Sequence, residues 1–313
     1  MKNKIHSVCL TLLALLVLGC EQPTMETETD AEERTEGNVT LKVEGFERYE
    51  GEGATREVRD VTEVCSRLNF IVYQNDAKVK AVNQTKDSKD FGKVSLTLPT
   101  GTYQVLVLAH SCAANPSQAH AEKIGFTNKS GFTDTFYHYG DLTVDADGAT
   151  MAMSLKRATA CFRLVTTDAK PSDVKRMRLY YTGGSGTLNA VTGYGCVNSK
   201  QYIIYNVGEE TGGLTLEAYT FLHDEEGQLN ITVSAYDANE NTLYEKELTD
   251  VPMKRNTITE YRGNLFDGSP LTPSPEPETP DNPDTPDEPD TDPTGGYTFT
   301  VDDAWAEVNV ITF

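Results

Sequence analysis

Few residues of this chain have the types and spacings that catalysis or metal binding requires. No two histidines stand at the His-x-x-x-His spacing that typifies zinc sites on a helix. The stretch TGGSG at residues 182–186 is rich in glycine but lacks the Lys of a phosphate-binding loop. It also fails the nucleophile-elbow pattern, because Thr187 stands where a second glycine belongs. The sequence therefore predicts no catalytic residue, no metal site and no cofactor.

The stretch DANEN at residues 237–241 begins like a calcium-binding EF-hand loop. However, Thr242 replaces the required glycine, and Leu248 stands where the bidentate Glu belongs. We therefore expect a hairpin turn at this point.

Cysteine chemistry is the next candidate, since the chain has six cysteines. Four of them follow the first 20 residues: Cys65, Cys112, Cys161 and Cys196. Four cysteines allow three pairings. One interpretation joins residues 65 to 112 and 161 to 196, each bridge stabilising the fold by about 3–4 kcal/mol. The other leaves all four as buried free thiols, and the sequence does not separate the two.

The N-terminus predicts export and lipid attachment. Lys2 and Lys4 precede an apolar run from Val8 to Leu18, about half of the roughly 20 residues that span a bilayer. Residues 1–19 therefore have the pattern of a secretory signal. Its end, VLGC, resembles a lipobox, whose cysteine is acylated, so we expect lipid on Cys20. The alternative is an ordinary signal peptide that happens to contain a cysteine.

Charge is distributed unevenly along the 313 residues, whose formal net charge is −21. Residues 61–266 hold 23 acids and 20 bases, a net charge of 20 − 23 = −3, whereas residues 267–296 hold nine acids and no base. Nucleic-acid binding needs a basic surface, so we expect no nucleic-acid partner.

The two flanks differ from the middle in composition. Residues 20–37 are rich in Glu and Thr and predict an acidic tether. Residues 267–296 contain nine of the 14 prolines and predict a disordered, extended spacer. Residues 297–313 return to β-type composition and contain the only tryptophan. An isolated hairpin is marginal in water, so this segment must pair with its own domain or with another molecule.

The middle of the chain alternates apolar and polar residues with the period of β-strands. Val39, Leu41 and Val43 share one predicted face, as do residues 229, 231, 233 and 235 further on. Turn signals every 8–12 residues favour sandwiches or barrels. A weak repeat near residue 155 divides the middle into residues 38–155 and 156–266, each large enough for its own core. We therefore predict an all-β fold with two tandem β-sandwiches.

Several phrases resemble a FimB-type fimbrial subunit of the fimbrillin superfamily, which builds the type V pili of anaerobic Gram-negative bacteria. The resemblance covers residues 1–266. It rests on the lipobox ending at Cys20 and on these phrases in order: NVTLKVEGF, ATR, EVCSRLNFIVY, LPTGTYQVLVLAH, GFTDTFYHYGDLTV, LKRATACFRLV, MRLYYTGGSG and VPMKRNTITEYRGNLF.

The resemblance implies transthyretin-like sandwiches, an outer-membrane lipid anchor, fimbrial partners, cell adhesion and no catalysis. In shaft subunits of the family, a protease cuts after an Arg near the start of the first domain and frees a groove that another subunit's β-segment fills. Arg56 is the matching position, and Arg59 is the near alternative. An anchor subunit must keep its lipid, so there Arg56 is expected to stay uncut.

Two functions follow as alternatives. In the first, a fimbrial anchor or assembly subunit offers residues 297–313 to a partner pilin, with Trp305, Val308, Val310 and Phe313 filling pockets. In the second, a surface lipoprotein captures glycan beside an uptake porin. Tyrosines would provide its stacking platform: Tyr180, Tyr181, Tyr194, Tyr202 and Tyr205. An enzyme is a distant third.

Overall fold

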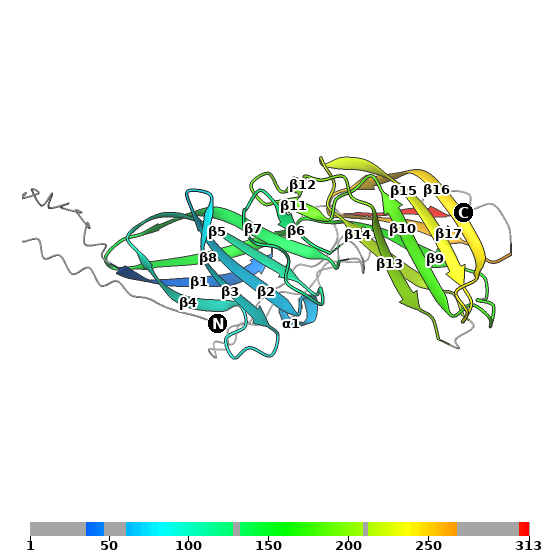
Figure 1. Ribbon diagram of the computed structural model, residues 1–313, viewed down its shortest axis with the longest axis horizontal. Coiled ribbons are helices and arrows are strands. Elements are labelled where there is room, and N and C mark those ends of the chain that lie inside the picture. The colour runs from blue at the N-terminus through cyan, green and yellow to red at the C-terminus, as the bar shows by residue number, and fades with distance from the viewer. Residues whose placement is uncertain (1–35, 47–60, 128–131, 209–211, 268–306, 313) are drawn as a thin grey trace, which may run out of the picture. The chain divides into compact units, whose positions relative to one another are not determined.

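The predicted all-β fold is confirmed. The computed structural model describes residues 36–46, 61–127, 132–208, 212–267 and 307–312 (Figure 1). In these ranges the regular structure is β-strand apart from one short helix, α1 (Val61–Val64). No helix in the described ranges is long and apolar enough to cross a membrane.

The first sandwich has seven strands. They are β1 (Glu36–Phe46), β2 (Arg67–Gln74), β3 (Ala77–Thr85), β4 (Lys93–Pro99), β5 (Gly101–His110), β7 (Thr135–Val144) and β8 (Ala149–Arg157). The sheet order is β3-β2-β5-β7-β8-β1-β4. The strands β7 and β8 pair only at Phe136–Arg157 and Tyr137–Lys156, so the sheet folds there into two layers around one apolar core.

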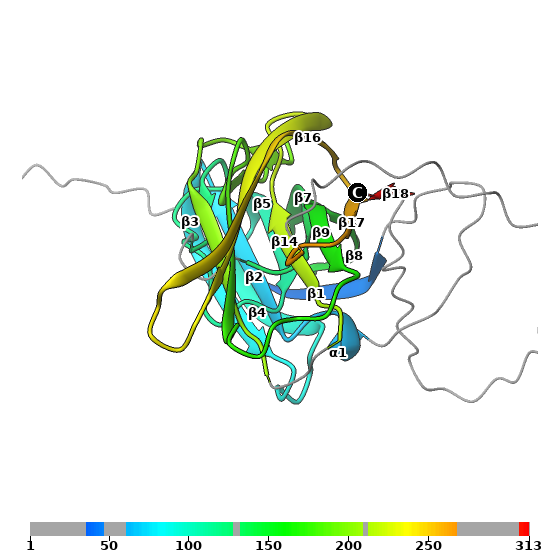
Figure 2. The same cartoon turned by 90° about the vertical axis from the view of Figure 1, so that its right-hand side faces the viewer.

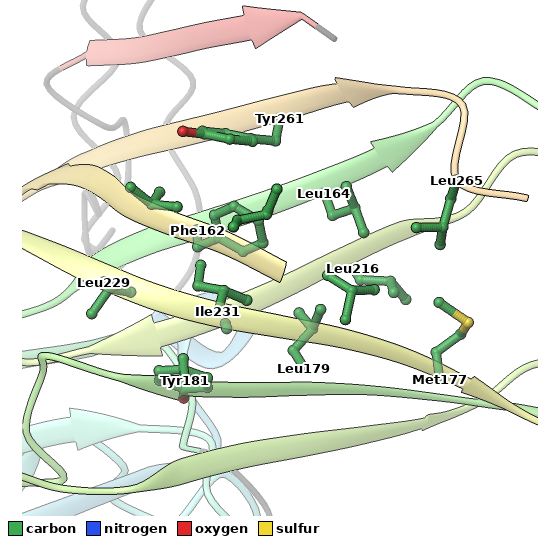
Figure 3. Close-up of a cluster of buried hydrophobic side chains, with 14 of the residues drawn as sticks. Phe162, Leu164, Met177, Leu179, Tyr181, Leu216, Leu229, Ile231, Tyr261 and Leu265 are labelled. Atoms are coloured by element: carbon green, nitrogen blue, oxygen red, sulfur yellow. The ribbon is translucent and has the colours of Figure 1, made fainter. Parts of the chain in front are cut away.

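The second sandwich repeats this plan with new strands. They are β9 (Ala160–Thr166), β10 (Arg176–Thr182), β13 (Gln201–Asn206), β14 (Thr215–Thr220), β15 (Glu226–Tyr236), β16 (Thr242–Lys254), β17 (Thr257–Gly263) and β18 (Glu307–Thr312). One layer has the order β13-β10-β15-β16 (Figure 1), and the other has the order β14-β9-β17-β18 (Figure 2). Side chains from both layers, including Leu179, Ile231 and Leu164, meet in the core between them (Figure 3).

A smaller layer joins the two sandwiches. It contains β6 (Ile124–Gly125), β11 (Thr187–Asn189) and β12 (Tyr194–Gly195). Its apolar cluster includes Phe132 and Phe221, whose rings stack with centroids 4.7 Å apart, and Phe126 lies within 5.5 Å of both. This cluster explains why β2 is apolar on both faces: Phe70 faces the first core, and Ile71 faces the joining layer.

A buried arginine reinforces this junction. The Nε of Arg157 donates to both carboxylate oxygens of Asp134 at 3.0 Å, and Nη1 donates to Asn256 Oδ1 at 2.8 Å. Asp134 also accepts from the Thr159 hydroxyl at 2.7 Å. Arg157 ends the first sandwich and Asn256 lies in the turn between β16 and β17, so the network ties the two sandwiches together.

Candidate strand-exchange site

Strand β1 is inserted between two other strands. It pairs antiparallel with β4 and parallel with β8, so that Leu41 lies opposite Val94 on one side and Met151 on the other. The turn that precedes β8 runs against the start of β1. Gly148 has φ +93° there, and a Cβ on it would collide with the backbone oxygen of Asn38. A glycine is therefore needed for this close approach.

The apolar face of β1 completes the first core, as the alternation predicted. Val39, Leu41 and Val43 are each no more than 1% exposed. Loss of β1 would leave a slot between β8 and β4, with unpaired backbone groups on both sides and core side chains such as Met153 and Leu98 along its floor. Another strand of suitable alternation could fill such a slot.

Two predicted residues of this site lie outside the described residues: the lipidation residue Cys20 and the cleavage candidate Arg56. The next described residue after Phe46 is Val61, so Arg56 belongs to the connection that follows β1. Both remain predictions.

The C-terminal segment pairs within its own chain in this structure. Strand β18 lies parallel to β17, with Val308 opposite Ile258 and Val310 opposite Glu260 (Figure 2). In the described residues, it is the last strand of its layer and pairs on one side only. The sequence left open whether this segment pairs with its own domain or with another molecule, and the structure has the first arrangement. Trp305 and Phe313 lie outside the described residues.

Charged residues cross the layer that accepts β18. Glu217 on β14, Arg163 on β9 and Glu260 on β17 lie in one row. The Arg163 guanidinium is 2.6 Å from Glu217 and 3.5 Å from Glu260, and Glu260 also binds Arg262 at 2.6 Å. Glu260 is only 4% exposed, and two guanidinium groups compensate its buried charge.

The four cysteines in the described residues are free, so of the two interpretations the one that joins residues 65 to 112 and 161 to 196 is not formed. Cys65 packs in the core of the first sandwich, whereas Cys112 packs in the joining layer. Cys161 is buried on β9, and Cys196 is exposed beside the Glu122 carbonyl. The alternative of buried free thiols holds for three of the four. Burial raises the pKa of the Cys65 thiol to about 12, which keeps it unreactive at neutral pH.

A buried polar network that the sequence did not indicate lies beside β2 and β5. His110 is fully buried; its Nε2 lies 2.9 Å from Asn69 Oδ1, and its Nδ1 accepts from the Cys112 amide at 3.1 Å. Asn69 also donates to Asn83 and Asn115 at 2.9 Å. Burial, together with the positive charge of Arg67, lowers the pKa of His110 to about 4. These residues come from distant segments and show no sequence period, so no local signal could have revealed them.

The five candidate tyrosines do not form one platform. Tyr181 is buried in the second core and donates to the Tyr219 carbonyl. Tyr205 packs against that core, and Tyr194 stacks on Arg255 in the joining layer. Only Tyr180 and Tyr202 pair on the outer face of the β13-β10-β15-β16 layer, where they lie directly opposite each other on β10 and β13.

The described residues show no group of three or more His, Cys, Asp or Glu that could hold a metal. The EF-hand-like stretch forms the turn between β15 and β16 that the sequence favoured. Its Asp237 carboxylate accepts from the amides of Asn239 and Asn241 and from the Asn241 side chain. These hydrogen bonds, that of the Asn241 side chain first, lower the pKa of Asp237.

Fold and site together define a tandem β-sandwich protein with an inserted first strand and an edge-paired last strand. The chain belongs to a family of unknown function (DUF6562), whose model matches residues 28–270. No curated protein matches the chain.

Similar solved structures include a proposed adhesin from Bacteroides ovatus, with 14% identity, coverage of 68% of this chain and 82% of that chain, and a TM-score of 0.46. A fimbrial assembly protein from Parabacteroides distasonis has 11% identity, coverage of 75% and 92%, and a TM-score of 0.40. The fimbrial anchor protein from Porphyromonas gingivalis has 12% identity, coverage of 68% and 83%, and a TM-score of 0.35.

Proposed function

We propose that the protein is a structural fimbrial subunit that pairs with other subunits by β-strand addition and supports cell adhesion. The observation that carries this proposal is the position of β1, which completes the first core while joined to the next strand through the segment that contains Arg56. The fimbrillin-like phrases of the sequence point in the same direction.

An anchor or assembly role suits this chain better than a shaft role. In the proposal, acyl chains on Cys20 hold the protein in the outer membrane, facing the cell exterior. Cys20 precedes β1 in the chain, so cleavage after Arg56 would separate both the lipid and β1 from the sandwiches. An anchor therefore keeps Arg56 uncut and its first sandwich closed, which leaves the C-terminal segment as the end that reaches a partner.

The C-terminal segment is suited to exchange because its pairing is limited to one edge. Strand β18 pairs only with β17, and residues 264–306 separate the two strands along the chain. Pairing across so long a connection corresponds to an effective concentration of about 1 mM or less. A partner that offers pairing on both sides, such as an open first-strand slot, can therefore compete with β17.

The decisive test is crosslinking in the native host. A photo-crosslinking residue replaces Val308, and the matched control places it at Val79, an exposed residue of the edge strand β3. We expect position 308 to capture a second fimbrial subunit and position 79 to capture none. Crosslinks confined to the same chain would contradict strand donation, and capture of an uptake porin would support the glycan-capture alternative.

A second experiment tests the anchor role. We expect Cys20→Ser to move the protein from the membrane fraction to the soluble fraction. Intact-mass measurement of the wild-type protein should show a chain that begins at acylated Cys20. A mature chain beginning at Glu57 would instead indicate a shaft subunit.

A further inference from the structure

The outer face of the β13-β10-β15-β16 layer carries an unusual set of side chains. On β10, Met177, Leu179 and Tyr181 point into the second core and are completely buried. The alternate residues of β10 therefore lie on the opposite face, and they are Arg176, Arg178 and Tyr180.

Neighbouring strands extend this set into rows. Tyr180 lies opposite Tyr202 on β13, and Arg178 lies opposite Ile204, which is 43% exposed. On the other side of β10, Arg176 lies opposite Tyr236 of β15. Three tyrosine rings and an exposed isoleucine thus lie beside two arginines on one face.

Tyr236 fixes the arginines in place. The guanidinium carbons of Arg176 and Arg178 lie 5.4 and 5.5 Å from the centre of its ring. Cation–π contacts of this length restrict a long side chain before any ligand arrives. Arg176 is also paired with Glu240.

Arg178 has no anionic partner among the described residues. Its Nε is buried without a hydrogen bond, and its guanidinium makes no ion pair in the described part of the chain. Three acids of this face have other partners or lie two strands away from β10. Glu240 binds Arg176. Glu245 and Glu247 are on β16, beyond β15, and Glu245 accepts from Ser234, the residue opposite Arg178, at 3.1 Å. The guanidinium of Arg178 can therefore pair with the carboxylate of a ligand.

From this arrangement we infer that the outer face around Arg178 binds an acidic polysaccharide whose sugars carry carboxylates. The planar guanidinium matches a carboxylate with two parallel hydrogen bonds. The apolar face of a pyranose ring packs on the tyrosine pair of Tyr180 and Tyr202, as flat apolar groups do on aromatic rings. The flat sheet face suits an extended sugar chain better than a compact ligand, which would need a concave pocket.

This inference does not depend on the strand-addition proposal, because β18 and β1 belong to other layers. It concerns what an exposed subunit contacts, and strand addition concerns how subunits join. The two can fail separately.

The test is titration calorimetry of the full-length protein with polygalacturonate oligosaccharides. Their methyl esters serve as the neutral counterpart, and dextran sulfate serves as the sulfated counterpart. We expect the wild-type protein to bind polygalacturonate and to bind both counterparts at least tenfold more weakly.

Variants assign the site. Arg178→Gln should weaken binding about tenfold or more, since it removes a charge-assisted pair. Tyr202→Ala should weaken it independently of charge. The matched control is Arg255→Gln, which removes an arginine stacked on Tyr194 at 5.1 Å and changes the net charge equally. Arg255→Gln should bind like the wild type.

Several results would overturn the inference: no binding by the wild type, equal binding of the methyl esters, or an equal loss in Arg255→Gln. Tighter binding of dextran sulfate that Arg178→Gln abolishes would overturn the carboxylate assignment. Thermal unfolding of each variant separates loss of binding from loss of fold.

Discussion

The two sandwiches share one strand plan and differ in one strand. In the first, β1 pairs antiparallel with β4 and parallel with β8; in the second, β9 pairs antiparallel with β14 and parallel with β17. The opposite layers, β3-β2-β5-β7 and β13-β10-β15-β16, correspond strand by strand. Within the described residues, only the second sandwich has an added strand, β18, on the edge of β17.

The difference lies in how the equivalent strands are joined to the chain. Strand β9 follows β8 after two residues, so the second sandwich keeps its first strand by covalent connection on both sides. Strand β1 is the first strand in the described part of the chain, and one cut after it would separate it from the later strands. In the strand-addition proposal, a cut after β1 would open the first sandwich, whereas the edge of β17 in the second sandwich accepts an added strand, β18.

Removal of β1 should have the largest effect. Deletion of residues 36–46 removes Val39, Leu41 and Val43 from the core, where a single buried Leu→Ala change costs about 2–5 kcal/mol. This sum approaches the whole stability of an ordinary domain, about 5–15 kcal/mol. We expect the first sandwich to lose its cooperative urea transition and to bind a hydrophobic dye.

Rescue in trans sharpens this prediction. A peptide with the sequence NVTLKVEGF should restore the urea transition and displace the dye, whereas a scrambled peptide should not. An unchanged transition in the deletion protein would show that β1 is dispensable, and the contrast with β9 would then disappear.

The junction between the sandwiches should have the next largest effect. Asp134→Asn removes the carboxylate from Arg157, whose side chain is 3% exposed. A buried guanidinium without its anion should cost about 3–5 kcal/mol in the free energy of unfolding. The control Glu240→Gln breaks the exposed pair with Arg176 and should cost less than about 1 kcal/mol. Equal costs in urea titrations would mean that the Asp134 carboxylate is not needed to hold Arg157.

The strand faces were predictable because their cause is local. The alternation at Val39, Leu41 and Val43, and again from residue 229 to 235, predicted the buried faces, which are at most 1% exposed. Period-two alternation is the direct consequence of strand geometry, so it survives in the sequence whatever the partners are.

The partners of those strands were not predictable. The pairing of β18 with β17 joins residues about 50 positions apart. It depends on which strand edge binds the C-terminal segment best, and no local turn determines that. The Arg178 face needs three strands in register before its members meet. The sequence left the state of the cysteines open, because Cys65 packs in the first core and Cys112 in the joining layer, and sequence spacing does not encode that difference.

Low pH should destabilise the first sandwich more than the second, because its His110 is the only buried histidine among the described residues. Its pKa falls from 6.5 to about 4 on folding, so between these values the unfolded chain binds a proton that the folded protein does not. The free energy of unfolding therefore decreases as the pH falls from 6.5 to 4, by about 3 kcal/mol, and this contribution is complete below 4.

Hydrogen exchange at several pH values measures this effect for each sandwich. Protection in β2 and β5 should decrease over the window, and protection in β10 and β15 should not. His110→Gln should remove the dependence, whereas His120→Gln, at an exposed site, should keep it. A dependence that persists in His110→Gln would place the titrating group elsewhere.

Loss of β18 should have the smallest effect, even though it removes a whole strand. Each backbone hydrogen bond contributes about 0.5–1.5 kcal/mol net, while ordering each residue costs about 1–2 kcal/mol. The free energy gained by pairing on one edge is therefore nearly cancelled by this ordering cost and by the entropy cost of closing the connecting segment. Replacing Glu307–Thr312 with a Gly-Ser segment of equal length should therefore change the free energy of unfolding by less than about 1 kcal/mol. Amide exchange should accelerate in β17 alone, because its outer edge becomes free while its pairing with β9 persists.

A loss of unfolding free energy as large as that of Asp134→Asn would make β18 a structural strand of the second sandwich, and strand donation would then require a partner able to offset that loss.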